Sequence, residues 1–215
     1  SAGVYVRYPV DELFAVLSLE SHRHQAIIVG ENLGTVPPEI GEAMDRHEVH
    51  GMYVVQYELQ PDQRLRTPPA HSAASLNTHD MPTFPSFWEA RDVTILQDLG
   101  FFDEGQAAEE RERRSVLRRK LLEEIPPEER TDEAAACAAV LRKLLEFLAS
   151  SPARLVLVNL EDLWGEVEPQ NVPGTHLERP NWRRKARRSF EEFSTDPQIL
   201  ETLRRVDRLR GEGSR

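Results

Sequence analysis

The stretch that decides the fold is Ala26–Pro37, which reads AIIVGENLGTVP. Its first four residues are apolar, as in a short strand buried on both faces of a parallel sheet. Glu31 comes directly after Gly30, and turn-forming residues and the helix start Pro38-Glu39-Ile40 follow. Barrel enzymes place catalytic carboxylates at the carboxyl ends of such strands. The stretch alone is equally compatible with a Glu31 that only caps the following turn.

The chain around this stretch alternates helical and strand patterns, which indicates an α/β fold. Helical spacing of apolar residues covers 11–24, and a second helix is predicted over 37–47. Four strands are predicted, namely Ala26–Val29, Gly51–Tyr57, Ala74–Thr78 and Leu155–Val158. We expect them to be parallel neighbours in that order.

Residues 86–150 read differently, as a helical insertion between the last two strands. Two long helices are predicted there, over Glu109–Glu124 and Thr131–Ala149, with Thr131 as the N-terminal cap of the second. Residues 180–215 are expected to form the C-terminal helices. The basic run at 183–188 reads as a helix start whose solvent-facing charges pair with Glu191 and Glu192, with an anionic partner as the less favoured alternative.

Composition narrows the classes of function. Apolar residues make up 39% and charged residues 30% of the 215 residues, as in one folded domain of ordinary size. A formal net charge of −10 argues against nucleic acid as the partner. The sequence contains no apolar run long enough for a membrane span and no visible secretory signal. Cys137 is the single cysteine, so we expect a cytoplasmic protein without an internal disulfide. Neither Cys137 nor the scattered histidines have the spacing of a metal site.

A second polar cluster, Asn77-Thr78-His79-Asp80, lies within the segment ASLNTHDMPT at 74–83. Together with VGENLGTVP, its NTHDMPT portion resembles the motifs of the 4-alpha-glucanotransferase (amylomaltase) family. The carboxyl-terminal segment, Asn171-Val172-Pro173-Gly174 followed by Asn181-Trp182-Arg183, is similar to another motif of that family. The opening Tyr5-Val6-Arg7-Tyr8-Pro9 also fits it.

The resemblance implies a (β/α)8 TIM barrel of which the four strands are strands 5–8. Residues 1–215 would then form a partial catalytic barrel domain. This domain would pack against the missing N-terminal half of the barrel, and it would bind an α-1,4-glucan or maltooligosaccharide as substrate.

The resemblance also assigns roles to single residues. Glu31 would be the general acid/base, and Asp80 a second carboxylate that stabilises positive charge on the sugar ring. His79, Asn32 and Asn171 would bind substrate. The less favoured alternative for His79 and Asp80 is a hydrogen-bonded pair at a turn, whereas a plain rigid turn is at least as good an explanation of Asn171.

The nucleophile has no counterpart here, and the resemblance places this aspartate upstream of Ser1. The family commonly has Asp where this chain has Asn32, and Asn where it has Met81. These departures leave the details of substrate binding open.

The activity implied is transfer of α-1,4-glucan segments between maltooligosaccharides by a retaining double displacement, with no metal or organic cofactor. The alternative is a non-catalytic α/β module that binds glucan or another protein. No membrane or nucleic-acid partner is expected.

Overall fold

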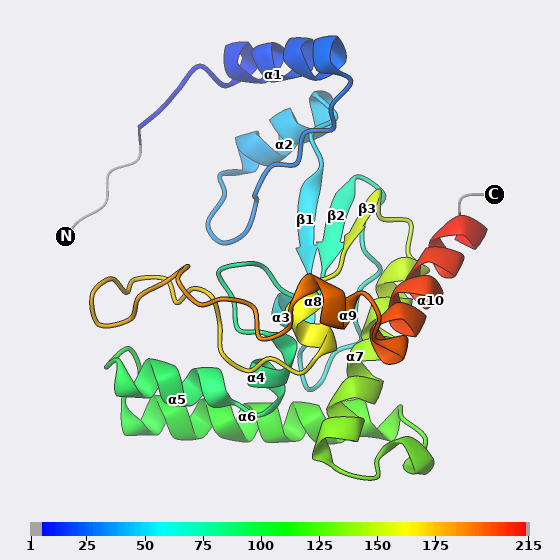
Figure 1. The fold of residues 1–215 in the computed structure, drawn as a ribbon. Coiled ribbons are helices and arrows are strands. Elements are labelled where there is room, and N and C mark those ends of the chain that lie inside the picture. Colours follow the sequence, from blue (N-terminus) through cyan, green and yellow to red (C-terminus); the bar gives the residue numbers. More distant parts are fainter. Residues whose placement is uncertain (1–5, 214–215) are drawn as a thin grey trace.

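The computed structural model describes residues 6–213, so Tyr5 of the opening motif lies outside the described residues. Figure 1 shows the strands at the centre, pointing toward the layer formed by α4, α5 and α6, with α7 and α10 alongside. In chain order the elements are α1 (Val10–His24), α2 (Pro38–Arg46), β1 (Gly51–Val54), α3 (Val55–Glu58), β2 (Ser72–Ser75), α4 (Phe84–Trp88), α5 (Arg91–Asp98), α6 (Glu104–Glu123), the 3-10 helix η1 (Pro127–Glu129), α7 (Glu133–Ala149), β3 (Leu155–Leu157), α8 (Leu160–Leu163), α9 (Phe190–Phe193) and α10 (Pro197–Gly213).

The sheet is parallel, with its strands in the order β1-β2-β3. Gly51 is paired with Ser72, and Ala73 with Leu155. This confirms the predicted order and direction of the last three strands.

The prediction of a full strand over Ala26–Val29 is wrong. This segment makes only an isolated parallel bridge, between Val29 and His50. The ladder stops because the side chain of Asn32 takes over the edge of β1, where its Oδ1 accepts a hydrogen bond from the Met52 amide at 2.8 Å. The segment is not buried as a central strand would be, since Ile27 is 47% and Val29 38% exposed.

The predicted strand Gly51–Tyr57 ends early, because Val55–Glu58 forms the helical turn α3. Val55 and Tyr57 both favour strands, but the turn buries Val55 completely in the core, and packing overrides local propensity. One backbone hydrogen bond still joins the turn to the segment after β2, from the amide of Gln56 to the carbonyl of Leu76 at 3.0 Å. The strand predicted at Ala74–Thr78 is also displaced, to Ser72–Ser75.

Helix α7 provides much of the hydrophobic core. Its buried face includes Leu144, Leu145 and Leu148. The helix begins after Asp132, whose Oδ1 accepts a hydrogen bond from the Ala135 amide at 2.8 Å. The predicted cap, Thr131, is therefore wrong by one residue, since the carboxylate of Asp132 reaches the free amide instead.

Helix α6 starts at Glu104, well before the predicted Glu109, because Asp103 and Gln106 form a capping box. Its Arg114 joins α6 to α5 and α4. The guanidinium is bonded to Asp92 at 3.0 Å and to the Phe87 carbonyl at 2.8 Å. Burial raises the pKa of Asp92 despite this partner.

Helix α1 agrees with its predicted range, but none of its residues is buried. Its apolar side chains face outward, with Leu13 49%, Val16 58% and Leu19 57% exposed. The Phe14 ring packs at a tilt against the His47 ring at the end of α2, with 5.6 Å between ring centroids. None of the helices in residues 6–213 is long and apolar enough to cross a membrane.

Candidate active site

The loop between β2 and α4 is anchored at both ends by one buried carboxylate. Asp162, in α8, accepts a hydrogen bond from Asn77 Nδ2 at 2.9 Å and from the Phe84 amide at 2.7 Å. Asp162 is only 4% exposed, and burial raises its pKa from 3.8 to about 7 against the opposing effect of these two bonds. The residues between these anchors include His79 and Asp80.

The tip of this loop presents Asp80 and His79 to solvent. The hydroxyl of Thr78 accepts from the amide of Asp80 at 3.3 Å, which shapes the turn. His79 Nε2 lies 3.5 Å from Asp80 Oδ2, and the side chains are 72% and 49% exposed. The two side chains are therefore neighbours, but no hydrogen bond joins them in the described structure, and they lie on a loop that follows a buried parallel strand.

Asn171 reaches this turn from a distant part of the chain. Its Nδ2 donates to Asp80 Oδ1 at 2.6 Å. The loop that carries Asn171 is itself rigid, because Asn181 closes it. Asn181 Oδ1 accepts from the Val172 amide at 3.2 Å, and Asn181 Nδ2 donates to Thr175 Oγ1 at 2.9 Å. The loop thus combines a rigid turn with a side chain that contacts the second carboxylate.

Trp182 joins the same group, although the sequence analysis gave it no site role. Its ring lies 5.7 Å from the His79 ring between centroids, and it is 56% exposed. The backbone of Trp182 has φ +60°, a strained value for an aromatic residue, and its amide donates to the Gln170 carbonyl at 2.9 Å. The signal in the sequence was the Asn181-Trp182 pair of the carboxyl-terminal motif.

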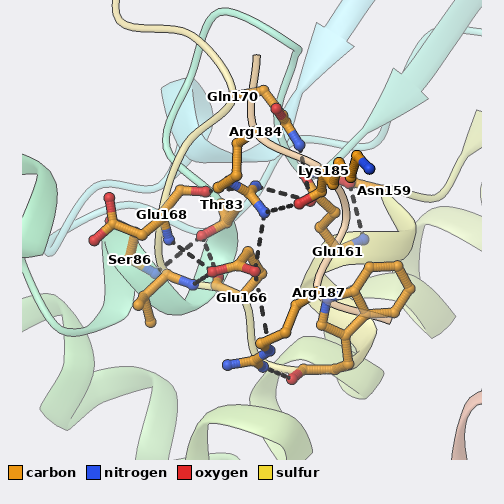
Figure 2. Close-up of polar contacts among 12 residues, drawn as sticks. Thr83, Ser86, Asn159, Glu161, Glu166, Glu168, Gln170, Arg184, Lys185 and Arg187 are labelled. Carbon is orange, nitrogen blue, oxygen red and sulfur yellow. Dashed lines mark hydrogen bonds and ion pairs between the residues drawn. The ribbon is translucent and has the colours of Figure 1, made fainter. Parts of the chain in front are cut away.

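A second, partly buried polar cluster, drawn in Figure 2, corrects the interpretation of the basic run at 183–188. This run is a loop and not a helix start. Arg184 lies between two carboxylates, with Glu161 at 2.8 Å and Glu166 at 3.1 Å. The side chain of Glu166 is only 6% exposed, so it needs the guanidinium as a partner. Arg184 and Arg187 therefore pair inward and Arg188 pairs with Asp196, while among the described residues the predicted ion pairs with Glu191 and Glu192 are not found.

Glu31 and Asn32 lie apart from this group. The bridge at Val29 and the pairing of β1 with β2 are both parallel. Glu31, which comes after Val29, and Asp80, which comes after β2, therefore lie toward the same edge of the sheet. Glu31 is exposed and makes no side-chain hydrogen bond or ion pair with the described residues. Asn32 has its oxygen committed to the Met52 amide, which leaves its NH2 group as the donor open to a ligand.

Two cavities open at this edge of the sheet. One, of about 380 Å³, is lined by Gln56, Asp80 and Asn171 among others. The other, of about 330 Å³, is lined by His79, Asn159 and Trp182 among others. Both volumes lie in the range of small-molecule sites. Within residues 6–213, no three histidine, cysteine or acidic side chains are grouped so as to hold a metal ion.

Comparison with known proteins gives consistent matches. A family model described as 4-alpha-glucanotransferase matches residues 1–190. A 4-alpha-glucanotransferase of Haemophilus influenzae is 32% identical over 193 residues, which are 85% of this chain and 28% of that protein. One of Mycobacterium tuberculosis is 32% identical over 192 residues, which are 84% and 26% of the two chains. The chain therefore spans about a quarter of the length of these relatives.

Solved structures agree on the fold. The amylomaltase of Corynebacterium glutamicum superimposes with a TM-score of 0.75 at 22% identity, over 96% of this chain and 32% of that one. The amylomaltase of Streptococcus agalactiae, solved in complex with acarbose, gives a TM-score of 0.64 at 17% identity, over 96% and 36%.

Proposed function

The chain belongs to the 4-alpha-glucanotransferase family, and from this premise we propose that it is the carboxyl-terminal part of an enzyme that transfers α-1,4-glucan segments between maltooligosaccharides. The observation that carries the proposal is the contact between Asn171 and Asp80. Two family-like motifs 91 residues apart in the sequence meet there, at the carboxyl edge of a parallel sheet. This is the edge at which barrel enzymes bind substrate.

In this proposal the three strands and the bridge at Val29 belong to strands 5–8 of a (β/α)8 barrel. The parallel order β1-β2-β3 and the greater length of the relatives support it. The remaining strands, and the aspartate that acts as nucleophile, would come from a part of the protein outside these 215 residues. We propose a cytoplasmic location, as the single cysteine suggested.

The mechanism follows from what each carboxylate must do. Retaining transfer needs one carboxylate as nucleophile and another as acid/base. Glu31 would protonate the departing glucosidic oxygen and later deprotonate the acceptor hydroxyl. Asp80 would face the sugar ring and stabilise the positive charge that develops on it, while Asn171 holds the carboxylate in position. His79 and the free amide group of Asn32 would bind hydroxyls.

The experiment separates these roles in the full-length protein that carries this chain. We expect Glu31→Gln to lower the rate of transfer from maltotriose by about 10²–10⁴-fold. A glucosyl fluoride leaves without a proton, so this variant should recover much of its first-step rate on that donor. Asp80→Asn should stay impaired on both donors, because charge develops on the ring whatever the leaving group.

The matched control is Glu39→Gln, which removes an exposed glutamate from nearby helix α2. Its rates should equal those of the unmodified protein. If the fluoride restores Asp80→Asn and leaves Glu31→Gln inactive, the two roles are reversed. If the unmodified full-length protein binds maltotriose but converts none of it, the non-catalytic glucan-binding alternative is correct.

A further inference from the structure

The cavity of about 330 Å³ has an accessible aromatic ring in its wall. Trp182 lines this cavity together with His79, and it is 56% exposed. The Trp182 ring lies 5.7 Å from the His79 ring between centroids, and His79 Nε2 in turn lies 3.5 Å from Asp80 Oδ2. The indole therefore lies next to the proposed reaction centre, one side chain beyond the carboxylate of Asp80.

The position of Trp182 is fixed from both sides. Its amide donates to the Gln170 carbonyl at 2.9 Å, and Asn181 closes the loop directly before it. Two residues later, Arg184 pairs with Glu161 at 2.8 Å (Figure 2). A side chain on such a backbone loses little freedom when a ligand binds, so most of the contact energy is available for binding.

The loop holds Trp182 in a costly arrangement. A large aromatic side chain contributes most to stability when it is buried, yet this one stays more than half exposed. Its backbone has φ +60°, which glycine adopts without strain and tryptophan does not. Strained backbone of this kind collects at sites that bind ligands, where the surrounding structure holds it in place. The two costs together indicate a ring that is presented to a ligand.

The chemistry of the cavity suits a hexose. The C–H groups on a face of a sugar ring carry partial positive charge, and they complement the negative face of an indole. Thr78 and Gln170 line the same cavity with a hydroxyl and a side-chain amide, the groups that bind sugar hydroxyls. The cavity thus combines an aromatic face with polar groups around it.

We propose that Trp182 is a substrate-binding residue whose indole stacks against the hexose unit next to the one that faces Asp80. The inference rests on the proposed glucan substrate and deepens it. Bond cleavage takes place at the unit that faces Asp80, and the unit at Trp182 takes no part in the chemistry. Trp182 therefore contributes to binding, and it favours chains of more than one hexose.

The test compares two donors in the full-length protein that carries this chain. Maltotriose is long enough to occupy the places at Asp80 and Trp182 together, whereas a glucosyl fluoride has a single hexose. We expect Trp182→Gly to raise KM for maltotriose about tenfold with kcat little changed, because the lost contact is the same in the ground state and the transition state. Release of fluoride from the single hexose should keep the rate of the unmodified protein. Trp182→Phe keeps an aromatic face and should restore most of the lost affinity.

The choice of variants separates binding from structure. Glycine removes the ring and also relieves the backbone strain, so its effect does not come from a destabilised loop. Leu177→Gly is the matched control, because Leu177 is 88% exposed on the same loop and lines neither cavity. Its KM and rates should equal those of the unmodified protein.

Two results would overturn the inference. Equal losses on both donors would show that Trp182 only supports the turn at Asp80, which serves both. A normal KM for maltotriose in Trp182→Gly would show that the ring does not contact the substrate. If the unmodified protein neither binds nor converts maltotriose, the proposed function fails instead.

Discussion

Replacement of Asp162 by asparagine should change the pH dependence of stability. Burial raises the pKa of this carboxyl from 3.8 to about 7 in the folded protein. Between pH 3.8 and about pH 7, the folded protein therefore keeps a proton on Asp162 that the unfolded chain has released. The neutral carboxyl makes its full contribution to the free energy of unfolding below about pH 4. This contribution declines as the pH rises and is lost above about pH 7.

The magnitude follows from the same shift. At about 1.4 kcal/mol for each unit, a rise from 3.8 to about 7 corresponds to at most about 4 kcal/mol of unfolding free energy. Asparagine does not titrate. Between pH 4 and pH 8 the variant should therefore gain up to this amount relative to the unmodified protein. The gain is offset by about 1 kcal/mol at every pH, because the new NH2 group faces the donor of Asn77.

The assay is urea unfolding followed by tryptophan fluorescence, at five values between pH 4.5 and pH 8.5, for both full-length proteins. All other titrating groups are shared, so the difference between the two curves isolates Asp162. The matched control for net charge is Asp207→Asn, which removes an exposed carboxylate from α10. A difference that stays constant with pH, or that shrinks as the pH rises, would show that hydrogen bonding outweighs burial at this site.

Three further outcomes are expected. Arg114→Met should lower the unfolding free energy by about 3–5 kcal/mol, because it leaves Asp92 buried without its partner, and the more exposed Arg113→Met should cost clearly less in the same urea titration. The thiol of Cys137, whose pKa burial raises to about 12, should react with a disulfide reagent only as fast as the protein opens. Gly174→Ala should destabilise by about 1–2 kcal/mol in thermal unfolding, since φ there is +83° and the new methyl would lie 3.3 Å from a phenyl carbon.

The sequence was a good guide where periodicity and chain order decide the outcome. The apolar runs near Gly51 and Leu155 lie in parallel strands in the predicted order, and the helical pattern of α7 agrees to within two residues. The sequence was a poor guide to strand length where a side chain takes the place of a backbone hydrogen-bond partner. The amide of Asn32 ends the ladder after Val29, which no propensity scale describes.

The site shows the same division. The motif residues near Asp80 and Asn171 could be identified separately, but their contact could not, because 91 residues separate them and only the fold brings them together. Arg184 was read as part of a surface helix because charge runs usually face solvent. Its carboxylate partners come from the segment after β3, which local sequence cannot reveal.

The double anchor at Asp162 has a consequence for how this chain tolerates change. The segment from α4 to β3 is an insertion between two neighbouring strands. Its entrance, the first residue of α4, is held by the bond from the Phe84 amide to Asp162, and its end leads into β3, which pairs with β2. The ends of α5 and α6 that lie away from Arg114 can lengthen or shorten, because they do not bear on the bonds that hold the entrance, whereas α7 is fixed by the core that it provides. Evolution can thus remodel the wall of the cavity of about 380 Å³, to which Ile95 and Leu96 of α5 contribute, while the turn at Asp80 keeps its place.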